Sequence, residues 1–506
     1  MRTSHTLLFI LSVFVLLGIG WYVFPAEGVE AGSLTLRFPS YEEDRMGETK
    51  AIDVDSVLNN VSKSFEMSVS ETLLDSLEFF RDYLTINPNR IYLPNDDYAY
   101  FDSLFCLLEN AQRDQKIYRV IHYGDSQIEM DRITSVLRQR LQEVFGGSGP
   151  GMISAIKRIS SISLIQSYSG NLVRYALVGD STSHKASHNR YGIMTQFCQT
   201  HGLSTVSFST TKHSQAYEKV KEISHVSMLI GNNSQGFKAT LKADNVQGES
   251  KVYEANQGIT LVSWELPGNV NKGTITMQGS AEIYGIMLDG DYGVAVDNNA
   301  LRGCSGTIFT RINKPLMRNS IQILDARMIL LQFGGNRMPS IYGTKNIVSY
   351  MEELDRQIKY LKEVAPQATL LFIGPADMGK SVNGKIGTWP GLPELNDSLK
   401  AMTLRNEVAY WDMFHVMGGE GSMAQYVKHR PPLAGPDHIH FTLLGAQEIG
   451  NDLAKSLIIY HDFYELRKRL PEEEIVEFMN KDRETIEKEK EARKYKFKPT
   501  DYYYYR

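Results

Sequence analysis

The chain has 506 residues, of which 42% are hydrophobic and 22% are charged, a balance typical of folded domains and not of a disordered chain. At roughly 100–200 residues per domain, this length suggests two to four folded units. The formal net charge is -5, so no basic excess favours nucleic acid as a partner. Cys106, Cys198 and Cys304 form no CxxC pair, which argues against a zinc or iron–sulfur site. At most one disulfide could form, and three free thiols are an equal alternative.

The N-terminus carries a long apolar run. Arg2 and His5 precede Leu7–Phe24, which as a helix would extend about 27 Å, close to the hydrocarbon core of a bilayer. No clear cleavage site follows, so residues 1–25 are predicted to be a transmembrane anchor, with a cleaved signal segment as the alternative. Because Arg2 favours the cytoplasmic side, we expect a cell-envelope protein. It would be anchored in the inner membrane facing the periplasm, or be released into the periplasm after cleavage.

Residues 26–117 are predicted to form a stalk followed by helices. Residues 25–65 lack a clear period and fit an irregular stalk. Ser70–Leu84 and Asp96–Arg113 place apolar residues at helical spacing, and Asn87-Pro88-Asn89 separates them as a turn.

An α/β pattern begins after this region. Tyr118–Tyr123 is a strand-like run that stops at Gly124-Asp125-Ser126, and a helical stretch follows over residues 131–144. A strand, a tight turn and a helix make one α/β unit. We therefore assign residues 118–170 to the first part of an α/β domain.

Residues 171–288 have a different pattern. Short alternating segments rich in β-branched residues are separated by turns at a spacing of about 8–12 residues, which predicts an inserted β-sandwich. The segments are VSFST, VSMLIGN, FKATLKA, ITLVSWELPG, GTITMQGS and AEIYGIML.

The α/β pattern returns in residues 289–465, and a charged tail follows over residues 466–506. The second part has three predicted strands and two predicted helices: Met328–Phe333, Thr369–Ile373 and Val408–Trp411, with Asn346–Val364 and Leu443–His461. The whole predicts an α/β fold, a Rossmann-like three-layer domain with a parallel sheet that the β-sandwich interrupts.

Polar clusters follow the strands of this domain. Ser126 lies between a strand and a helix, where the first N–H groups of the helix can face a developing oxyanion. A serine needs a base to become a nucleophile, and Asp437-x-x-His440 supplies a base together with a carboxylate that orients it. The alternative is structural, with Ser126 as a helix cap and His440 as a packing residue. His438 is the weaker candidate for the base, because Asp437 is its direct neighbour and could not orient it.

These residues resemble the conserved blocks of the SGNH/GDSL hydrolase superfamily. The first block is similar to Gly124-Asp125-Ser126, the third to Gly334-Gly335-Asn336, and the last to Asp437-x-x-His440. The second-block glycine best matches Gly303, with Gly306 as the alternative. The resemblance implies Ser126 as nucleophile, His440 as base and Asp437 as the orienting group, without a metal or cofactor. It also implies an oxyanion hole of the Ser126 and Gly303 N–H groups and the Asn336 side chain.

The inserted β-region narrows this resemblance to bacterial peptidoglycan and polysaccharide O-acetylesterases with a carbohydrate-binding-like β-domain. The phrases GDSQIEMDRIT, FGGSGPG and GVAVDNNALRG are similar to those of envelope proteins of this superfamily. The sequence departs from the family at Gln127, where many members have leucine, and at Arg337, where many have aspartate. Residues that could line the substrate pocket are Asp125, Gly335, Arg337 and Asp377, and Asp377 could equally just end its strand.

The resemblance thus implies a serine carbohydrate esterase that acts on an acetylated glycan through an acyl-enzyme. The membrane would be a second partner, through the N-terminal helix. An O-acetyltransferase with the same triad and a non-catalytic glycan-binding envelope protein are the alternatives.

Overall fold

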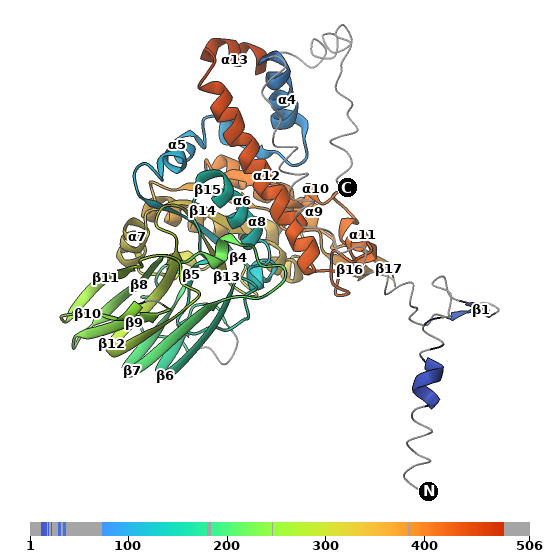
Figure 1. Cartoon of the computed structure of the whole chain (residues 1–506). Helices are drawn as coiled ribbons and strands as arrows, with labels where there is room; N and C mark the ends of the chain where they lie inside the picture. The colour runs from blue at the N-terminus through green and yellow to red at the C-terminus, as the bar shows by residue number, and fades with distance from the viewer. Residues whose placement is uncertain are drawn as a thin grey trace. The chain divides into compact units, whose positions relative to one another are not determined.

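The structure, a computed structural model, describes residues 12–17, 19, 22, 29–31, 34–36, 73–179, 184–244, 246–382 and 385–479 (Figure 1). It divides into two units, residues 1–77 and residues 78–506. In the first unit, β1 (Val29–Ala31) pairs antiparallel with β2 (Leu34–Leu36) inside the predicted stalk. The other residues of that stalk lie outside the described ranges.

The predicted anchor is described only in part. Residues 12–17, 19 and 22 are helical, and the rest of the run Leu7–Phe24 lies outside the described residues. Within the ranges given above, no helix has both the length and the apolar character that crossing a bilayer requires. The structure thus gives the anchor no support, and it stays a prediction from the sequence.

The helices before the first parallel strand are shorter or shifted relative to the predictions. The first helix, predicted over Ser70–Leu84, is α4 (Leu73–Ile86) in the structure. The second, predicted over Asp96–Arg113, is α5 (Asp102–Asn110). Pro94 begins a short 3-10 turn over Pro94–Asp96, which explains why α5 starts later than its apolar spacing suggests. Between the two helices lies β3 (Ile91–Tyr92), a strand that the sequence analysis did not predict.

A six-stranded sheet forms the centre of the second unit and confirms the predicted α/β class. Five strands are parallel, and β3 pairs antiparallel with β18 at one edge. The strand order is β13 (Gly293–Ala300), β4 (Ile117–Gly124), β14 (Ala326–Gln332), β15 (Thr369–Ile373), β18 (Ala409–Trp411) and β3. β13 was not predicted. β13 lies on one side of β4, whereas the later parallel strands β14, β15 and β18 follow on the other side. The order in which strands are added to the sheet therefore reverses at β4.

Helices cover both faces of this sheet, because alternate side chains of β4 meet different helices. Ile121 and Tyr123 pack in one cluster with residues of α7, α8 and α9, whereas His122 Nδ1 lies 3.0 Å from Thr134 Oγ1 of α6. The helices are α6 (Thr134–Phe145), α7 (Lys314–Ile323), α8 (Thr344–Val364), α9 (Leu392–Arg405), α10 (Met413–Val416), α11 (Ser422–Lys428), α12 (Leu443–Arg467) and α13 (Glu472–Met479). α12 packs against α6, where Gly450 allows close contact with Val136.

A second, eight-stranded sheet lies between β4 and β13 in the sequence. It contains β5 (Gly151–Ile153), β6 (Leu164–Ala176), β7 (Gln196–Thr210), β8 (His225–Asn233), β9 (Phe237–Ala243), β10 (Val246–Tyr253), β11 (Asn256–Glu265) and β12 (Lys272–Asp289). The first half of β12 pairs with β9 and β7, and its second half pairs with β8 and β5. Side chains from both halves form one buried cluster, so the strands enclose a core of their own.

A buried ion-pair network joins this β-region to the parallel sheet. Arg119 of β4 donates to Asp289 at the end of β12 (2.5 Å) and to Asp297 of β13 (2.6 Å). All three side chains are almost completely buried. Burial opposes the charge of Arg119, but the two carboxylates outweigh it and hold the pKa of Arg119 above its ordinary value. The network holds the end of the insertion against the strand that leads to Ser126.

Candidate active site

The predicted site residues lie where the order of the parallel strands reverses. β4 ends at Gly124, directly before Asp125-Ser126, and its neighbour β14 ends at Gln332, before Gly334-Gly335-Asn336. β13 flanks β4 on the other side and leads to Gly303. In open α/β sheets, ligands bind outside the carboxyl ends of the strands at such a reversal point.

Ser126, His440 and Asp437 form one hydrogen-bonded chain. Ser126 Oγ lies 2.8 Å from His440 Nε2, and His440 Nδ1 lies 2.7 Å from Asp437 Oδ2. With the Nδ1 proton held by the carboxylate, Nε2 is free to accept the serine proton. This arrangement separates His440 from His438, since the hydroxyl of Ser126 bonds only the former.

The carboxylate of Asp437 also holds its own loop. Its Oδ1 accepts hydrogen bonds from the backbone N–H groups of Ile439 (3.0 Å) and His440 (3.1 Å). Partial burial opposes ionisation, but the His440 side chain and these N–H groups outweigh it and hold the pKa of Asp437 below its ordinary value. Asp437 therefore stays ionised at neutral pH and can stabilise a protonated His440.

Gln127 joins this loop by hydrogen bonds to the segment after β4 that carries Ser126. Its Nε2 donates to Ile439 O (2.6 Å), and Phe441 N donates to its Oε1 (3.4 Å). These two backbone groups flank His440. A leucine at this position could make neither bond, so the departure from the family pattern gives Gln127 a specific contact with the loop of the base.

Arg132 strengthens the same connection and was missed by the sequence analysis. Its guanidinium donates to the carbonyl oxygens of Ser126, Gln127 (2.9 Å) and Phe441 (2.9 Å). Gln127 and Arg132 thus join the two segments that carry the nucleophile and the base. Nothing in the spacing of Gly-Asp-Ser-Gln-Ile-Glu-Met-Asp-Arg indicates this, since Ile439 and Phe441, the partners in the second segment, lie more than 300 residues away.

Asn336 lies at the site, and its side-chain amide already donates two hydrogen bonds to protein atoms. Its Nδ2 donates to Asp125 Oδ2 (2.9 Å) and to Cys304 O (3.2 Å). Asn336 therefore bridges the residue before Ser126 and the residue after Gly303. Its predicted role as an oxyanion donor requires it to exchange one of these bonds.

Asp125 lies behind the nucleophile as a buried cap. Its Oδ1 accepts from Gln127 N (2.9 Å), which fixes the first turn after β4. Burial raises the pKa of Asp125 to about 6, although the Gln127 N–H, His440 and Asn336 oppose this. Only 6% of Asp125 is exposed, so it supports the site from within and contributes little to the wall of a pocket.

The structure favours Gly303 over Gly306 as the second-block glycine. Gly303 has a left-handed backbone (φ 74°), open space where a Cβ would stand, and an N–H that donates to no described residue. The N–H of Gly306 instead donates to Cys304 Sγ (3.3 Å), and its Cα faces the ring of Phe333. The Ser126 N–H likewise bonds no described residue, so neither of these two backbone donors has an acceptor among the described residues.

The remaining predicted pocket residues have structural partners. Arg337 pairs with Glu353 of α8 (3.4 Å) and lies over the Tyr350 ring, so it points along α8. Asp377 is buried and accepts from Met423 N (2.8 Å) at the start of α11, which fits the alternative in which it has a structural role after its strand. A side chain on Gly335 would stand near Met378 Sδ and Asp125 Oδ2, so this glycine permits close packing behind the site.

One group among the described residues could hold a metal ion, and it lies on α5 and α12, away from the Ser126 chain. It consists of Glu109, His461 and Glu465. Lys468 Nζ binds both carboxylates, at 3.0 Å for Glu109 and more closely for Glu465, and already supplies the positive charge. Cys106, Cys198 and Cys304 are free thiols, so the alternative without a disulfide is correct.

The sequence itself matches no protein family profile and no curated protein. Among solved structures, the chain is similar to one titled "Peptidoglycan O-acetylesterase in action", with 18% sequence identity and a TM-score of 0.57. The match covers 72% of this chain and 96% of that chain. At this level of identity the likeness shows the fold alone, and the fold is compatible with the resemblance that the motifs indicate.

Other similar structures match less well. One is a family two carbohydrate esterase from Cellvibrio japonicus, with 8% identity, 59% of this chain and 99% of that chain covered, and a TM-score of 0.23. Another is a putative GDSL-like lipase from Parabacteroides merdae, with 16% identity, 33% and 74% covered, and a TM-score of 0.24. TM-scores this low add nothing to the fold assignment.

Proposed function

We propose that this protein is a serine-dependent carbohydrate esterase that removes O-acetyl groups from peptidoglycan or another envelope glycan. The observation that carries the proposal is the chain of two hydrogen bonds from Ser126 Oγ through His440 to Asp437, at 2.8 and 2.7 Å. The order of the motifs and the fold shared with a peptidoglycan O-acetylesterase support the same reaction class.

The first half of the reaction would form an acyl-enzyme. Ser126 Oγ attacks the acetyl carbonyl carbon while His440 Nε2 takes the hydroxyl proton, and Asp437 stabilises the resulting imidazolium. The carbonyl oxygen becomes an oxyanion near the free N–H groups of Ser126 and Gly303. Collapse breaks the bond to the sugar oxygen, which leaves as a hydroxyl after taking the proton from His440.

The second half would release acetate. Water gives a proton to His440 and its oxygen attacks the acyl carbon, and the tetrahedral adduct then expels Ser126 Oγ, which regains the proton. Asn336 would contribute to both halves if an oxyanion replaces Asp125 or Cys304 as the acceptor for its amide. The half-exposed position of Asp437 and His440 leaves the site accessible to a bulky sugar leaving group.

A direct test uses 4-nitrophenyl acetate together with a fluorophosphonate probe that labels activated serines. The wild-type protein should hydrolyse the ester, and peptide mapping should place the label on Ser126. Ser126→Ala should lose both properties while keeping the melting temperature of the wild type. Unchanged hydrolysis by Ser126→Ala, or a label on another residue, would exclude this mechanism.

We further propose that the protein acts in the cell envelope, through the apolar run Leu7–Phe24 that Arg2 precedes. The support is in the sequence alone. Fractionation of cells that produce the full chain should place it in the membrane pellet, and deletion of residues 1–25 should remove it from there. An equal distribution of both forms would contradict the anchor.

A further inference from the structure

The turn that carries Gly303 is closed by one hydrogen bond and attached to the end of β4 by another. Leu301 N donates to the carbonyl oxygen of Gly124 (2.7 Å), and Cys304 N donates to Leu301 O (2.9 Å). The second bond closes a β-turn with Arg302 and Gly303 at its centre. Gly303 has a positive φ (74°) and Arg302 does not, which is the pattern of a type II turn. The Gly303 N–H thus belongs to the central peptide group of this turn.

The centre of the turn has few contacts of its own. The Gly303 N–H donates to no described residue, and the space where a Cβ of Gly303 would stand is open. Glycine also restrains its own backbone less than any other residue does. The position of this N–H relative to Ser126 therefore depends on the residues beside Gly303.

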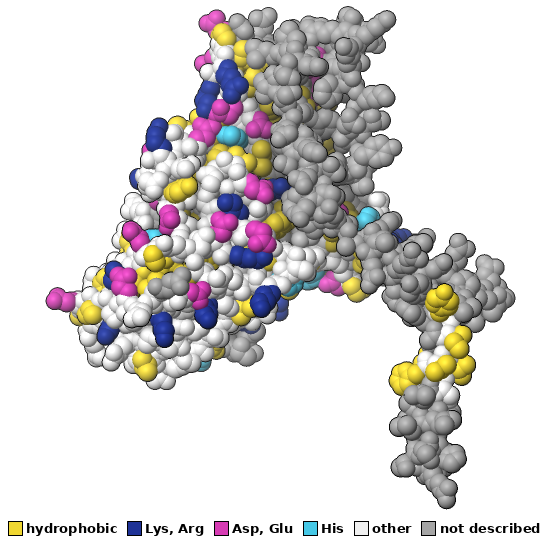
Figure 2. All heavy atoms as spheres, viewed as in Figure 1, with side chains coloured by type: hydrophobic (Ala, Val, Ile, Leu, Met, Phe, Trp, Pro, Cys, Tyr) yellow, Lys and Arg dark blue, Asp and Glu magenta, His cyan; other side chains and the backbone are white. Residues whose placement is uncertain are grey.

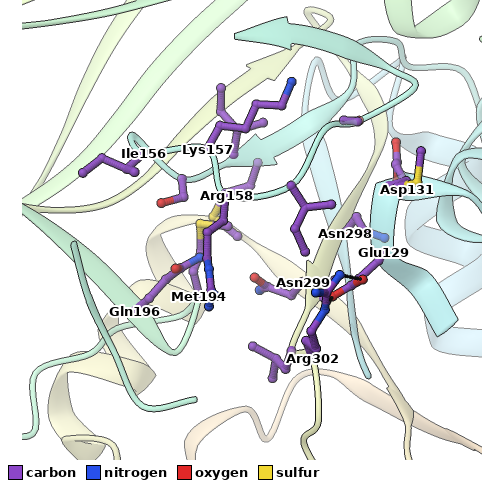
Figure 3. A pocket seen from close by; sticks show the side chains of 18 of the residues that line it. Glu129, Asp131, Ile156, Lys157, Arg158, Met194, Gln196, Asn298, Asn299 and Arg302 are labelled. Carbon is purple, nitrogen blue, oxygen red and sulfur yellow. Dashed lines mark hydrogen bonds and ion pairs between the residues drawn. The ribbon is translucent and has the colours of Figure 1, made fainter. Parts of the chain in front are cut away.

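Arg302 makes an ion pair that differs from ordinary surface pairs. Side chains of both charges are mixed over the face drawn in Figure 2, and exposed pairs contribute little to stability. The guanidinium of Arg302 instead binds Glu129 at two points, with Nε 2.7 Å from Oε1 and Nη2 2.6 Å from Oε2 (Figure 3). The Glu129 side chain is only 8% exposed, so solvent screens this pair less. Two parallel hydrogen bonds also fix the direction of the arginine.

The backbone directly after Glu129 is strained. Met130 and Asp131 have left-handed conformations (φ 61° and 67°), which are unfavourable for residues other than glycine. Such strain persists where the surroundings hold it in place. Arg138 holds Asp131 by two bonds, at 2.6 and 3.0 Å. Arg302 holds Glu129 on the other side of Met130, so ion pairs fix the segment after the nucleophile at both of its ends.

We propose that Arg302 and Glu129 are positioning residues of the oxyanion hole. Their pair joins the segment that follows Ser126 to the residue before Gly303, and so holds the two backbone donors around one developing oxyanion. The proposal rests on the proposed esterase function and adds two residues to its machinery. Both residues also line a cavity of about 260 Å³, so the alternative role is a direct contact with the substrate, which the experiment separates.

The test measures kcat and kcat/KM for 4-nitrophenyl acetate in Arg302→Met, Glu129→Gln and the double variant, together with their melting temperatures. Arg302→Lys keeps the charge but reaches the carboxylate with a single nitrogen. Arg190→Met is the matched control. Arg190 lies between β6 and β7 and also binds a buried glutamate, Glu282, at two points (3.1 and 2.5 Å).

Arg302→Met should lower kcat and kcat/KM by the same factor, about 10- to 100-fold, because a displaced donor weakens an interaction made only in the transition state. Glu129→Gln should lose activity in the same way. The double variant should be no worse than Arg302→Met, since the two side chains act through one contact. Arg302→Lys should lie between the wild type and Arg302→Met, and Arg190→Met should keep kcat within about twofold even if its melting temperature falls.

Unchanged kcat in Arg302→Met, an equal loss in Arg190→Met, or losses that multiply in the double variant would overturn the proposal. A rise in KM at constant kcat would overturn it as well, because the pair would then bind the substrate. If Arg302→Met does not fold, Arg302→Lys and Glu129→Gln provide the same comparison with Arg190→Met. Absence of wild-type hydrolysis of 4-nitrophenyl acetate would instead overturn the esterase function itself.

Discussion

Gln127→Leu tests whether the contacts between the nucleophile segment and the loop of His440 control catalysis. The substitution keeps the volume of a side chain that is only 7% exposed and removes its bonds to Ile439 O (2.6 Å) and Phe441 N (3.4 Å). A hydrogen bond contributes about 0.5–1.5 kcal/mol, and a buried group left without a partner costs about 1–3 kcal/mol. Because the second bond is long, we expect a total loss of about 1–3 kcal/mol.

The loss should affect catalysis, because the two freed backbone groups flank the base. If His440 must regain its position for each proton transfer, a loss of this size lowers kcat by about 5- to 140-fold, at 1.4 kcal/mol per factor of ten. KM for 4-nitrophenyl acetate should change much less, since Gln127 is buried behind the nucleophile. Steady-state kinetics and differential scanning calorimetry of the same preparations provide the required measurements.

Gln139→Leu is the matched control. Gln139 is similarly buried on α6, and its amide bonds Glu143 of the same helix (2.8 Å). Both variants should melt at lower temperature than the wild type, but only Gln127→Leu should lose kcat. If Gln127→Leu keeps kcat within about twofold while its melting temperature falls, its contacts support the fold and not the base.

Three further variants test other parts of the structure. Asp437→Asn should lower kcat by about 100-fold or more, because an amide cannot hold the reactive tautomer of His440, and it should barely change the melting temperature; equal kcat would contradict the assigned role. Burial raises the pKa of Asp452 to about 7, so this group stabilises the fold at low pH and the stabilisation is lost as pH rises through 7. Asp452→Asn should therefore gain in melting temperature relative to the wild type between pH 5 and pH 8, and a constant difference would refute this reasoning. A Cβ on Gly445 would stand 2.0 Å from Leu433 O, so Gly445→Ala should cost about 1–3 kcal/mol in a chemical denaturation experiment; unchanged stability would show that the segment has room to move.

The α/β class and the order of the site could be read from the sequence because both depend on local patterns. Apolar runs that end in Gly-Asp-Ser and Gly-Gly-Asn indicate strand ends, and parallel strands bring their carboxyl ends to one edge. β13 was missed because its polar residues do not look like a buried strand. Asp297 is buried there in an ion pair with Arg119, a residue far away in the sequence.

Two other differences come from contacts between distant segments. β12 was read as two strands because Gly279-Ser280 resembles a turn, but the glycine (φ 118°) lets one long strand continue between two sets of partners. Asp377 follows a strand end like a site residue, and only the folded chain shows that α11 uses its carboxylate as a cap. The contacts of Gln127 and Arg132 belong to the same class, since their partners surround His440.

The most direct test of the central claim is the initial rate of acetate release from O-acetylated peptidoglycan by the wild type and by Ser126→Ala. We predict steady release by the wild type and a loss of at least about 1,000-fold in the variant, with equal melting temperatures. Release by Ser126→Ala at a rate near that of the wild type would contradict the assignment of Ser126 as the nucleophile.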